Sequence, residues 1–382
     1  MPLLRRCTGG VIIGQGAVGM STNEDYFDSS IQKPQRHLVT LERLVVKGPP
    51  GEALLTIHPC CTSSCGSDFE PFYDFPRENN STKSLELAKS WLSTCKRNHP
   101  QCSFDSHSYI PSRLLDVSTA KPRLVLRAEI FDNTPFVALS HCWGKSLHLT
   151  TTSQNLDLHR EGIALDEFPP TLRDAIIITR KIGLDYIWID SICIIQDSVA
   201  DWGEESGHMD KIYGQADLVL AASAARNSEV GILNKRTTIP HGFVSLPNKD
   251  QAIPPTFQFR LLVRHRGQDE LDSRAWAFQE RLMARRYLSF TGQDLVWECC
   301  EYSTCECGWN LTKSQPFEHL RNLKVMMETT SREHWVEDLW RRQIINVYTQ
   351  MSLSIPSDKL VGLSAVASQI QATFGGTYLA GL

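Results

Sequence analysis

Residues 183–197 read GLDYIWIDSICIIQD, an apolar run of strand length that turns polar at Asp190. The aromatic and β-branched residues from Tyr186 to Ile189 are typical of a strand that is buried on both faces. In an open parallel sheet, ligands bind beyond the carboxyl ends of the strands, which is where Asp190 stands. The stretch therefore predicts a central strand followed by Asp190 as a candidate catalytic or ligand-binding residue. The alternative is that Asp190 only caps the next turn.

A second strand-like run, PFVALSHCWG, covers residues 135–144. Between the two runs, prolines at 169 and 170 and Gly183 are the start and stop signals of a helix. A strand, a helix and a strand within about fifty residues form a right-handed parallel crossover, whose strand ends meet at one edge. We therefore expect residues 140–144 to lie beside residues 190–196.

The same alternation continues along the chain, with a helix at 201–214, a strand in ADLVLAASAA, and a helix at 273–283 before short strands around Ser289 and Val296. This pattern predicts an α/β fold with a parallel wound sheet and helices on both faces. Outside it we expect strands within 36–58, joined at Gly48–Gly51, and a strand at 259–264. Helices are expected at 84–95, 333–353 and 357–374. We divide the chain into an N-terminal arm and elaboration (1–83), a helical lead-in (84–130), the α/β domain (131–310) and a C-terminal helical segment (311–382).

The composition is that of a soluble globular protein, with 41% hydrophobic and 21% charged residues among 382. A net charge of -4 disfavours nucleic-acid binding. No apolar stretch approaches the roughly 18 residues of a membrane span, and there is no signal-peptide core, which indicates a cytosolic or nuclear protein. Of the two we expect a cytoplasmic protein. The glycines of VIIGQGAVG at 11–19 have dinucleotide-motif spacing, but no helical pattern follows, which indicates a flexible arm. The chain stops at YLAGL without a terminating turn, which favours a natural chain that continues.

Two cysteine clusters could hold zinc. Cys95, His99 and Cys102 form a C-x3-H-x2-C cluster that one cysteine from 60–65 would complete. The cysteines packed at the end of a helix explain the same cluster without a metal. The second cluster has adjacent cysteines and a C-x-C instead of the usual C-x2-C knuckles, and consists of Cys299, Cys300, Cys305 and Cys307. We favour free thiols, assign no metal ligand and leave zinc open.

Three blocks closely resemble the heterokaryon incompatibility (HET) domain of filamentous fungi: ALSHCWG at 138–144, YIWIDSICIIQDS at 186–198 and SRAWAFQERL at 273–282. MDKIYGQADLVL at 209–220 lies between the last two. The stretches 91–102 and 348–367 resemble segments that flank that domain, so the resemblance covers roughly residues 85–382. It implies a role in non-self recognition between fungal cells that ends in programmed cell death.

A second resemblance bears on chemistry. The order of a strand, an Asp-ending strand, a small-residue strand and S-x-x-W-x-x-x-E is similar to that of the TIR domain. This resemblance implies a flavodoxin/TIR-like sheet. Some TIR domains hydrolyse NAD with a glutamate that follows a tryptophan, and Glu280, four residues after Trp276, would take that place. The chain departs from the TIR pattern at Ala277, where a cysteine is common, and in the inserted segment 225–257.

The chemistry of that reaction fits a carboxylate. Cleavage of the bond between nicotinamide and ribose builds positive charge on the sugar, which a preorganised carboxylate stabilises. We predict Glu280 and Asp190 as catalytic residues, with NAD as substrate and no required cofactor. A tryptophan would stack on a ring and Arg274 would bind phosphate. The residues predicted to contact the nucleotide are Ser140, Trp143, Gly144, Cys193, Gln196, Arg274, Trp276 and Gln279. The structural alternative is that the tryptophans fill the core and Arg274 pairs with Glu280.

Three functions stay open at this point. The first is a cell-death effector that hydrolyses NAD or a related nucleotide. The second is a non-enzymatic signalling module that associates with itself or with an incompatibility partner protein. The third is a thiol enzyme that uses Cys142 or Cys193 with His141, which is disfavoured because adjacent side chains on a strand point to opposite faces.

Overall fold

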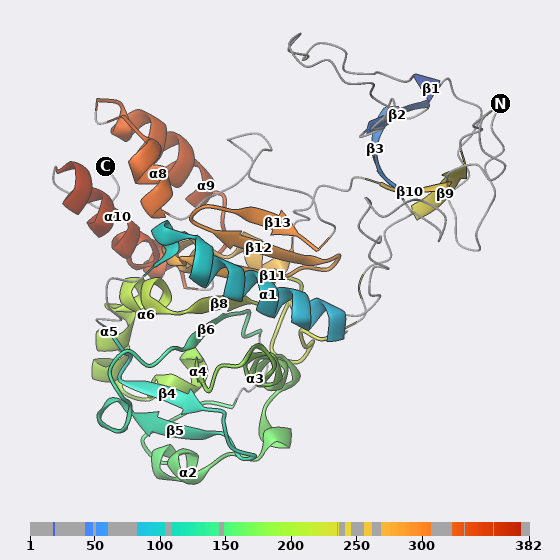
Figure 1. Cartoon of the computed structure of the whole chain (residues 1–382). Coiled ribbons are helices and arrows are strands. Elements are labelled where there is room, and N and C mark those ends of the chain that lie inside the picture. The colour runs from blue at the N-terminus through green and yellow to red at the C-terminus, as the bar shows by residue number, and fades with distance from the viewer. Residues whose placement is uncertain are drawn as a thin grey trace. The chain divides into compact units, whose positions relative to one another are not determined.

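The computed structural model, shown in Figure 1, divides into two compact units that are described separately. One unit holds Met1–Phe75 and Thr237–His265, and the other holds Pro76–Arg236 and Arg266–Leu382. The structure describes residues 18–19, 43–48, 51–59, 82–103, 109–144, 149–234, 236, 241–245, 256–261, 269–306, 323–331, 333–353 and 355–375. No helix in these ranges is long and apolar enough to cross a bilayer. The four-part division made from the sequence stays a prediction.

The smaller unit contains an antiparallel sheet in the order β1-β2-β3-β10-β9. Its strands are β1 (Val18–Gly19), β2 (Arg43–Gly48), β3 (Gly51–Pro59), β9 (His241–Ser245) and β10 (Thr256–Leu261). The expected hairpin is confirmed, since β2 and β3 pair on either side of the turn, with Gly48 opposite Gly51. The strand expected at 259–264 is β10. The flexible-arm prediction is wrong at β1, which pairs with β2. Gly14, Gly16 and the cysteines at 60, 61 and 65 lie outside the described residues.

The larger unit is built on an eight-stranded sheet in the order β13-β12-β11-β8-β6-β7-β4-β5. Its strands are β4 (Arg113–Asp116), β5 (Arg123–Leu126), β6 (Val137–Ser140), β7 (Tyr186–Trp188), β8 (Leu218–Ala221), β11 (Arg286–Phe290), β12 (Leu295–Cys299) and β13 (Ser303–Cys305). The α/β prediction is confirmed, but the prediction of a wholly parallel sheet is wrong because the sheet is mixed. Short turns join β4 to β5 and β11 to β12 and β13, and such connections can join only antiparallel neighbours.

The interior of this sheet is parallel. β7, β6, β8 and β11 run in the same direction, with β6 between β7 and β8. The strand segments at β6 and β8 are buried along their whole length, as expected for strands covered on both faces. Two further strands, β4 and β5, extend the sheet beyond β7 and were not expected from the sequence. The stretch that begins at Gly183 thus does form an inner strand, β7, as predicted.

Helices cover the sheet in two groups. α3 (Pro170–Ile182) contacts α1 (Thr82–Asn98), whereas α6 (Met209–Gln215), α7 (Ala275–Met283) and α10 (Val361–Phe374) contact one another. β7 and β8 lie on opposite sides of β6, so right-handed crossovers place α3 and α6 on opposite faces. The predicted helix over 170–182 is confirmed, with proline at its first position and Gly183 in a left-handed conformation at its end.

Other helical segments complete the larger unit. They are α2 (Leu156–Glu161), α4 (Asp190–Cys193), α5 (Val199–Ser206), α8 (Leu323–Thr329), α9 (Asn346–Tyr348), a π-helical segment (Val336–Ile345) and 3-10 turns at Pro100–Cys102, Arg127–Glu129, Leu165–Glu167, Glu270–Ser273 and Pro356–Lys359. The single helix expected over 201–214 is divided into α5 and α6 at Gly207, because glycine is a weak helix former. The helix expected over 333–353 is mainly π-helical, and that expected over 357–374 is α10.

Candidate functional site

The candidate site lies where the strand order reverses. The chain crosses from β6 to β7 on one side and then returns past β6 to β8 on the other. At such a point the carboxyl ends of the strands leave room for a ligand in open α/β sheets. Ser140 is the last residue of β6, and it pairs in register with Ala221 at the end of β8. The polar residues that follow β6 and β7 therefore share one edge of the sheet.

Glu280 reaches this edge from α7. Its side chain is 8% exposed, and the Ser140 hydroxyl donates a hydrogen bond to its carboxylate. Burial raises the pKa of Glu280 to about 7, and the negative charge of Asp190 adds to the rise. The hydrogen bond from Ser140 and the positive charge of Arg274 act in the opposite direction. Both protonation states of Glu280 are therefore populated near neutral pH, as a group that transfers protons or stabilises charge requires.

Asp190 joins the ends of β6 and β7. Trp143 donates its ring N–H to Asp190 Oδ2 over 2.7 Å, and His141 Nδ1 lies 3.9 Å from Oδ1. The same Oδ1 accepts the backbone N–H of Ser191 over 2.7 Å, within the first turn of α4, whose N-cap residue is Ile189. The side chain of Asp190 is 25% exposed. The expectation that residues 140–144 lie beside 190–196 is confirmed by the bond between Trp143 and Asp190. Asp190 bonds within its own turn but is not the cap of α4, and its carboxylate is partly exposed.

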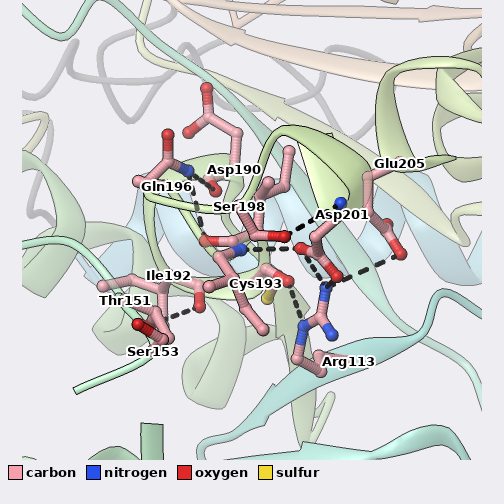
Figure 2. A network of polar contacts seen from close by, with 12 residues as sticks. Arg113, Thr151, Ser153, Asp190, Ile192, Cys193, Gln196, Ser198, Asp201 and Glu205 are labelled. Carbon is pink, nitrogen blue, oxygen red and sulfur yellow. Dashed lines mark hydrogen bonds and ion pairs between the residues drawn. The ribbon is translucent and has the colours of Figure 1, made fainter. Parts of the chain in front are cut away.

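A buried polar network, shown in Figure 2, fixes the backbone around Asp190. Arg113 on β4 donates to the carbonyl of Cys193 and to both carboxylate oxygens of Asp201, each over 2.6 Å. Asp201 in turn accepts the backbone N–H of Ile195 over 2.7 Å. Gln196 closes the turn by donating to the carbonyl of Asp190 over 3.0 Å. The site carboxylate is thus held by a rigid turn, and the predicted contact residue Gln196 has a positioning role.

The loop after β6 is fixed from two sides. Arg274 at the start of α7 donates to the carbonyl of His141 over 2.7 Å. Gly144 has φ +84°, which favours glycine, and a Cβ there would overlap the side chain of Asn227. The ring of Trp143 therefore projects from a loop with little freedom. Ser140 and Glu280 are buried, whereas the other members of this group keep some solvent exposure: Trp143, Gly144, Asp190, Gln196 and Arg274.

Three predicted contact residues stand apart from this group. Trp276 lies against α10, where its ring is near Gly362. Gln279 is buried, and its Oε1 has no hydrogen-bond partner in the described part of the chain. Cys193 is fully buried, and burial raises the pKa of its thiol to about 12. The positions of these three residues give no support to contact with a nucleotide.

The cysteines also bear on the thiol-enzyme alternative. Burial raises the pKa of Cys142 as well as that of Cys193, and a nucleophilic cysteine needs the opposite shift. Six described cysteines are free thiols, as expected, whereas Cys305 is in a disulfide. The structure therefore gives no support to catalysis by Cys142 or Cys193.

Tyr213 is a site residue that was not singled out from the sequence. Its hydroxyl donates to the carbonyl of Leu139 over 3.1 Å, and a hydrogen bond with Tyr213 lowers the pKa of Glu280. Burial raises the pKa of Tyr213 itself well above its ordinary value. The position of Tyr213 within MDKIYGQADLVL, one of the blocks that carry the resemblance, was the available signal.

The family model described as "Heterokaryon incompatibility protein (HET)" matches residues 136–280. The matched range begins directly before β6 and ends at Glu280, so it contains both strand ends and the carboxylate that meets them. No curated protein and no solved structure matches the chain.

Proposed function

We propose that this chain, a HET domain protein by its match over residues 136–280, is a fungal cell-death effector that hydrolyses NAD at Glu280. The observation that carries the proposal is the buried Glu280 carboxyl, which has a pKa of about 7 and is hydrogen-bonded to Ser140 at the reversal point of the sheet. The TIR-like order of motifs in the sequence supports NAD as the substrate.

The reaction needs little beyond a positioned carboxylate. Nicotinamide departs with the electron pair of its bond to ribose, and positive charge develops on the sugar. The ionised form of Glu280 stabilises that charge, more effectively in a buried site than in water. Water then adds to the ribose carbon and loses a proton, which gives ADP-ribose and free nicotinamide. Because water supplies the group that replaces nicotinamide on the ribose, the reaction balances without a metal or a redox cofactor.

The surrounding residues have distinct roles in this proposal. Ser140 orients the carboxyl of Glu280, and Asp190 keeps its proton affinity high. Trp143 presents a half-buried ring, anchored through Asp190, on which a nucleotide base could stack. Arg274 carries positive charge beside the loop and suits the pyrophosphate of the substrate.

The strand order supports the TIR-like part of the proposal. The parallel strands run β7-β6-β8-β11, which is the order of the first four strands in flavodoxin-like sheets, 2-1-3-4. The antiparallel strands at both edges and Ala277 after Trp276 are departures from the TIR pattern.

The test is incubation of purified full-length protein with NAD, followed by chromatography for free nicotinamide. We expect release by wild type and a fall of at least about 100-fold in Glu280→Gln, as for loss of one electrostatic stabiliser. Asp269→Asn is the matched control, because burial also raises the pKa of this carboxyl, to about 6, directly before the 3-10 turn Glu270–Ser273. Equal release by wild type and Glu280→Gln would refute the proposal. Inert wild type and variant that both kill fungal cells would favour the non-enzymatic alternative, in which self-association or a partner protein causes death.

A further inference from the structure

A second cluster of reactive side chains lies away from the Glu280 site, at the junction between α1 and β12. The ligand atoms of Cys95, His99, Cys102 and Cys299 all lie within 4.8 Å of one another. Cys299 Sγ is 3.3 Å from His99 Nδ1. In a tetrahedral zinc site with Zn–S of about 2.3 Å and Zn–N of about 2.0 Å, neighbouring ligand atoms are about 3.5 to 3.8 Å apart. Four side chains that can bind zinc are therefore already grouped at nearly the ligand spacing of a tetrahedral site.

Local structure explains why three of these side chains face the same way. Cys95 is in the last turn of α1, and the backbone N–H of His99 donates to its carbonyl over 3.1 Å. The 3-10 turn that begins at Pro100 then brings Cys102 back, with its N–H donating to the carbonyl of His99 over 3.1 Å. The C-x3-H-x2-C segment thus brings three potential zinc ligands together at the end of α1.

The fourth member comes from nearly 200 residues further along the chain. Cys299 is the last residue of β12, and the next residues bind the same helix end, since Glu301 accepts the backbone N–H of Gln101 over 2.8 Å. The sequence pattern predicted a fourth ligand among the cysteines at 60–65, which lie outside the described residues. Cys300 is the neighbouring thiol, and it contacts both the carbonyl of Arg285, 3.9 Å from its Sγ, and the side chain of Cys102. It is not one of the four side chains whose ligand atoms all lie within 4.8 Å of one another.

The surroundings of the sulfur atoms suit thiolates. Arg286 is buried and donates its Nε–H to Cys95 Sγ over 3.2 Å, and its Nη2–H to the carbonyl of Cys102 over 2.7 Å. Cys299 Sγ accepts the backbone N–H of Tyr302 over 3.3 Å. Three thiolates, one neutral histidine and Zn²⁺ carry one net negative charge, which Arg286 balances. Such outer hydrogen bonds orient the ligands of metal sites.

We propose that Cys95, His99, Cys102 and Cys299 bind one structural zinc ion that ties the end of α1 to the edge of the sheet. All four positions of the tetrahedron are filled by protein, with Cys95 and Cys102 fully buried, which is the arrangement of a structural and not a catalytic zinc. The ion joins segments far apart in sequence and stabilises the β11–β13 edge that follows α7.

The test is the zinc content of purified full-length protein, measured by elemental mass spectrometry after gel filtration. We expect about one zinc per chain in wild type and less than about 0.2 in Cys299→Ser. Cys300→Ser, the matched control at the adjacent residue, should keep about one zinc. Removal of the metal with a chelator should lower the Tm by about 5 °C or more, and added zinc should restore it. Wild type with less than about 0.1 zinc after incubation with the metal, or Cys299→Ser that retains it fully, would overturn the proposal.

A second measurement covers the case in which Cys299→Ser does not fold. Wild-type protein depleted of metal and titrated with Co²⁺ should show the visible bands of tetrahedral cobalt and a strong thiolate-to-metal charge-transfer band. A cobalt spectrum without thiolate bands would show that the cysteines are not ligands. A disulfide between Cys95 and Cys102 in freshly purified protein, detected by mass under non-reducing conditions, would also overturn the proposal.

Discussion

Replacement of Glu280 by glutamine should change how the stability of the protein depends on pH. The pKa of Glu280 is about 7 in the folded protein, against 4.5 for the ordinary carboxyl. One pKa unit corresponds to about 1.4 kcal/mol, so ionisation of this group costs the folded state about 3 kcal/mol relative to the unfolded chain.

The sign follows from proton binding. Between pH 4.5 and 7 the folded protein holds the proton of Glu280 while the unfolded chain has lost it, so the contribution of this group to stability falls as pH rises through that window. Glu280→Gln lacks the effect. The difference in unfolding free energy between variant and wild type should therefore grow by about 2.5 kcal/mol in favour of the variant from pH 5 to pH 8.

The assay is urea unfolding of both proteins at pH 5, 6, 7 and 8, followed by tryptophan fluorescence. Other groups with raised pKa, such as Asp269, contribute equally to both proteins and cancel in the difference. Glu86→Gln, the same substitution at an exposed position of α1, controls for the loss of one charge. A difference that stays constant within about 0.5 kcal/mol across the range would refute the burial argument for Glu280.

Three further substitutions test the neighbourhood of this carboxyl. Ser140→Ala removes a hydrogen bond that lowers the pKa of the Glu280 carboxyl. Nicotinamide release at pH 7 should therefore fall about tenfold, and the midpoint of its pH profile should move to higher pH. An unchanged midpoint would count against the contact between Ser140 and Glu280. Trp143→Phe keeps a ring but removes the 2.7 Å bond to Asp190, which should lower unfolding free energy by about 1 kcal/mol and raise KM for NAD; an unaltered KM would exclude the loop from binding. Gly144→Ala forces a side chain into a left-handed conformation against Asn227 and should cost about 2 kcal/mol in urea unfolding, so a variant as stable as wild type would contradict the loop geometry.

The interior of the fold could be predicted from local patterns. The run at Tyr186–Trp188 and the helix ended by Gly183 carry their own signals, and the right-handed crossover rule then places Asp190 beside Trp143. The edges of the sheet could not be predicted in this way. The direction of β4 depends on its pairing with β7, about 70 residues later, and nothing in the local sequence of RLLD specifies that partner.

The candidate site likewise contains some residues that could be found from the sequence and others that could not. Ser140 and Asp190 could be found because each follows a strand, and Glu280 because of its spacing from Trp276. The position of Tyr213 beside Glu280 depends on how α6 packs, and helical periodicity marks such a residue only as buried. The grouping of Cys299 with the C-x3-H-x2-C cluster depends on the contact of α1 with β12, which no spacing within either segment encodes.

The catalytic role of the Glu280 carboxylate is tested most directly by one measurement, the rate of nicotinamide release from NAD by purified protein between pH 5 and pH 9. Because the ionised form is the active one, kcat/KM of wild type should rise with pH and level off above a midpoint near 7, and Glu280→Gln should be inactive throughout. A rate that is the same in wild type and Glu280→Gln across this range, or no nicotinamide from either, would contradict it.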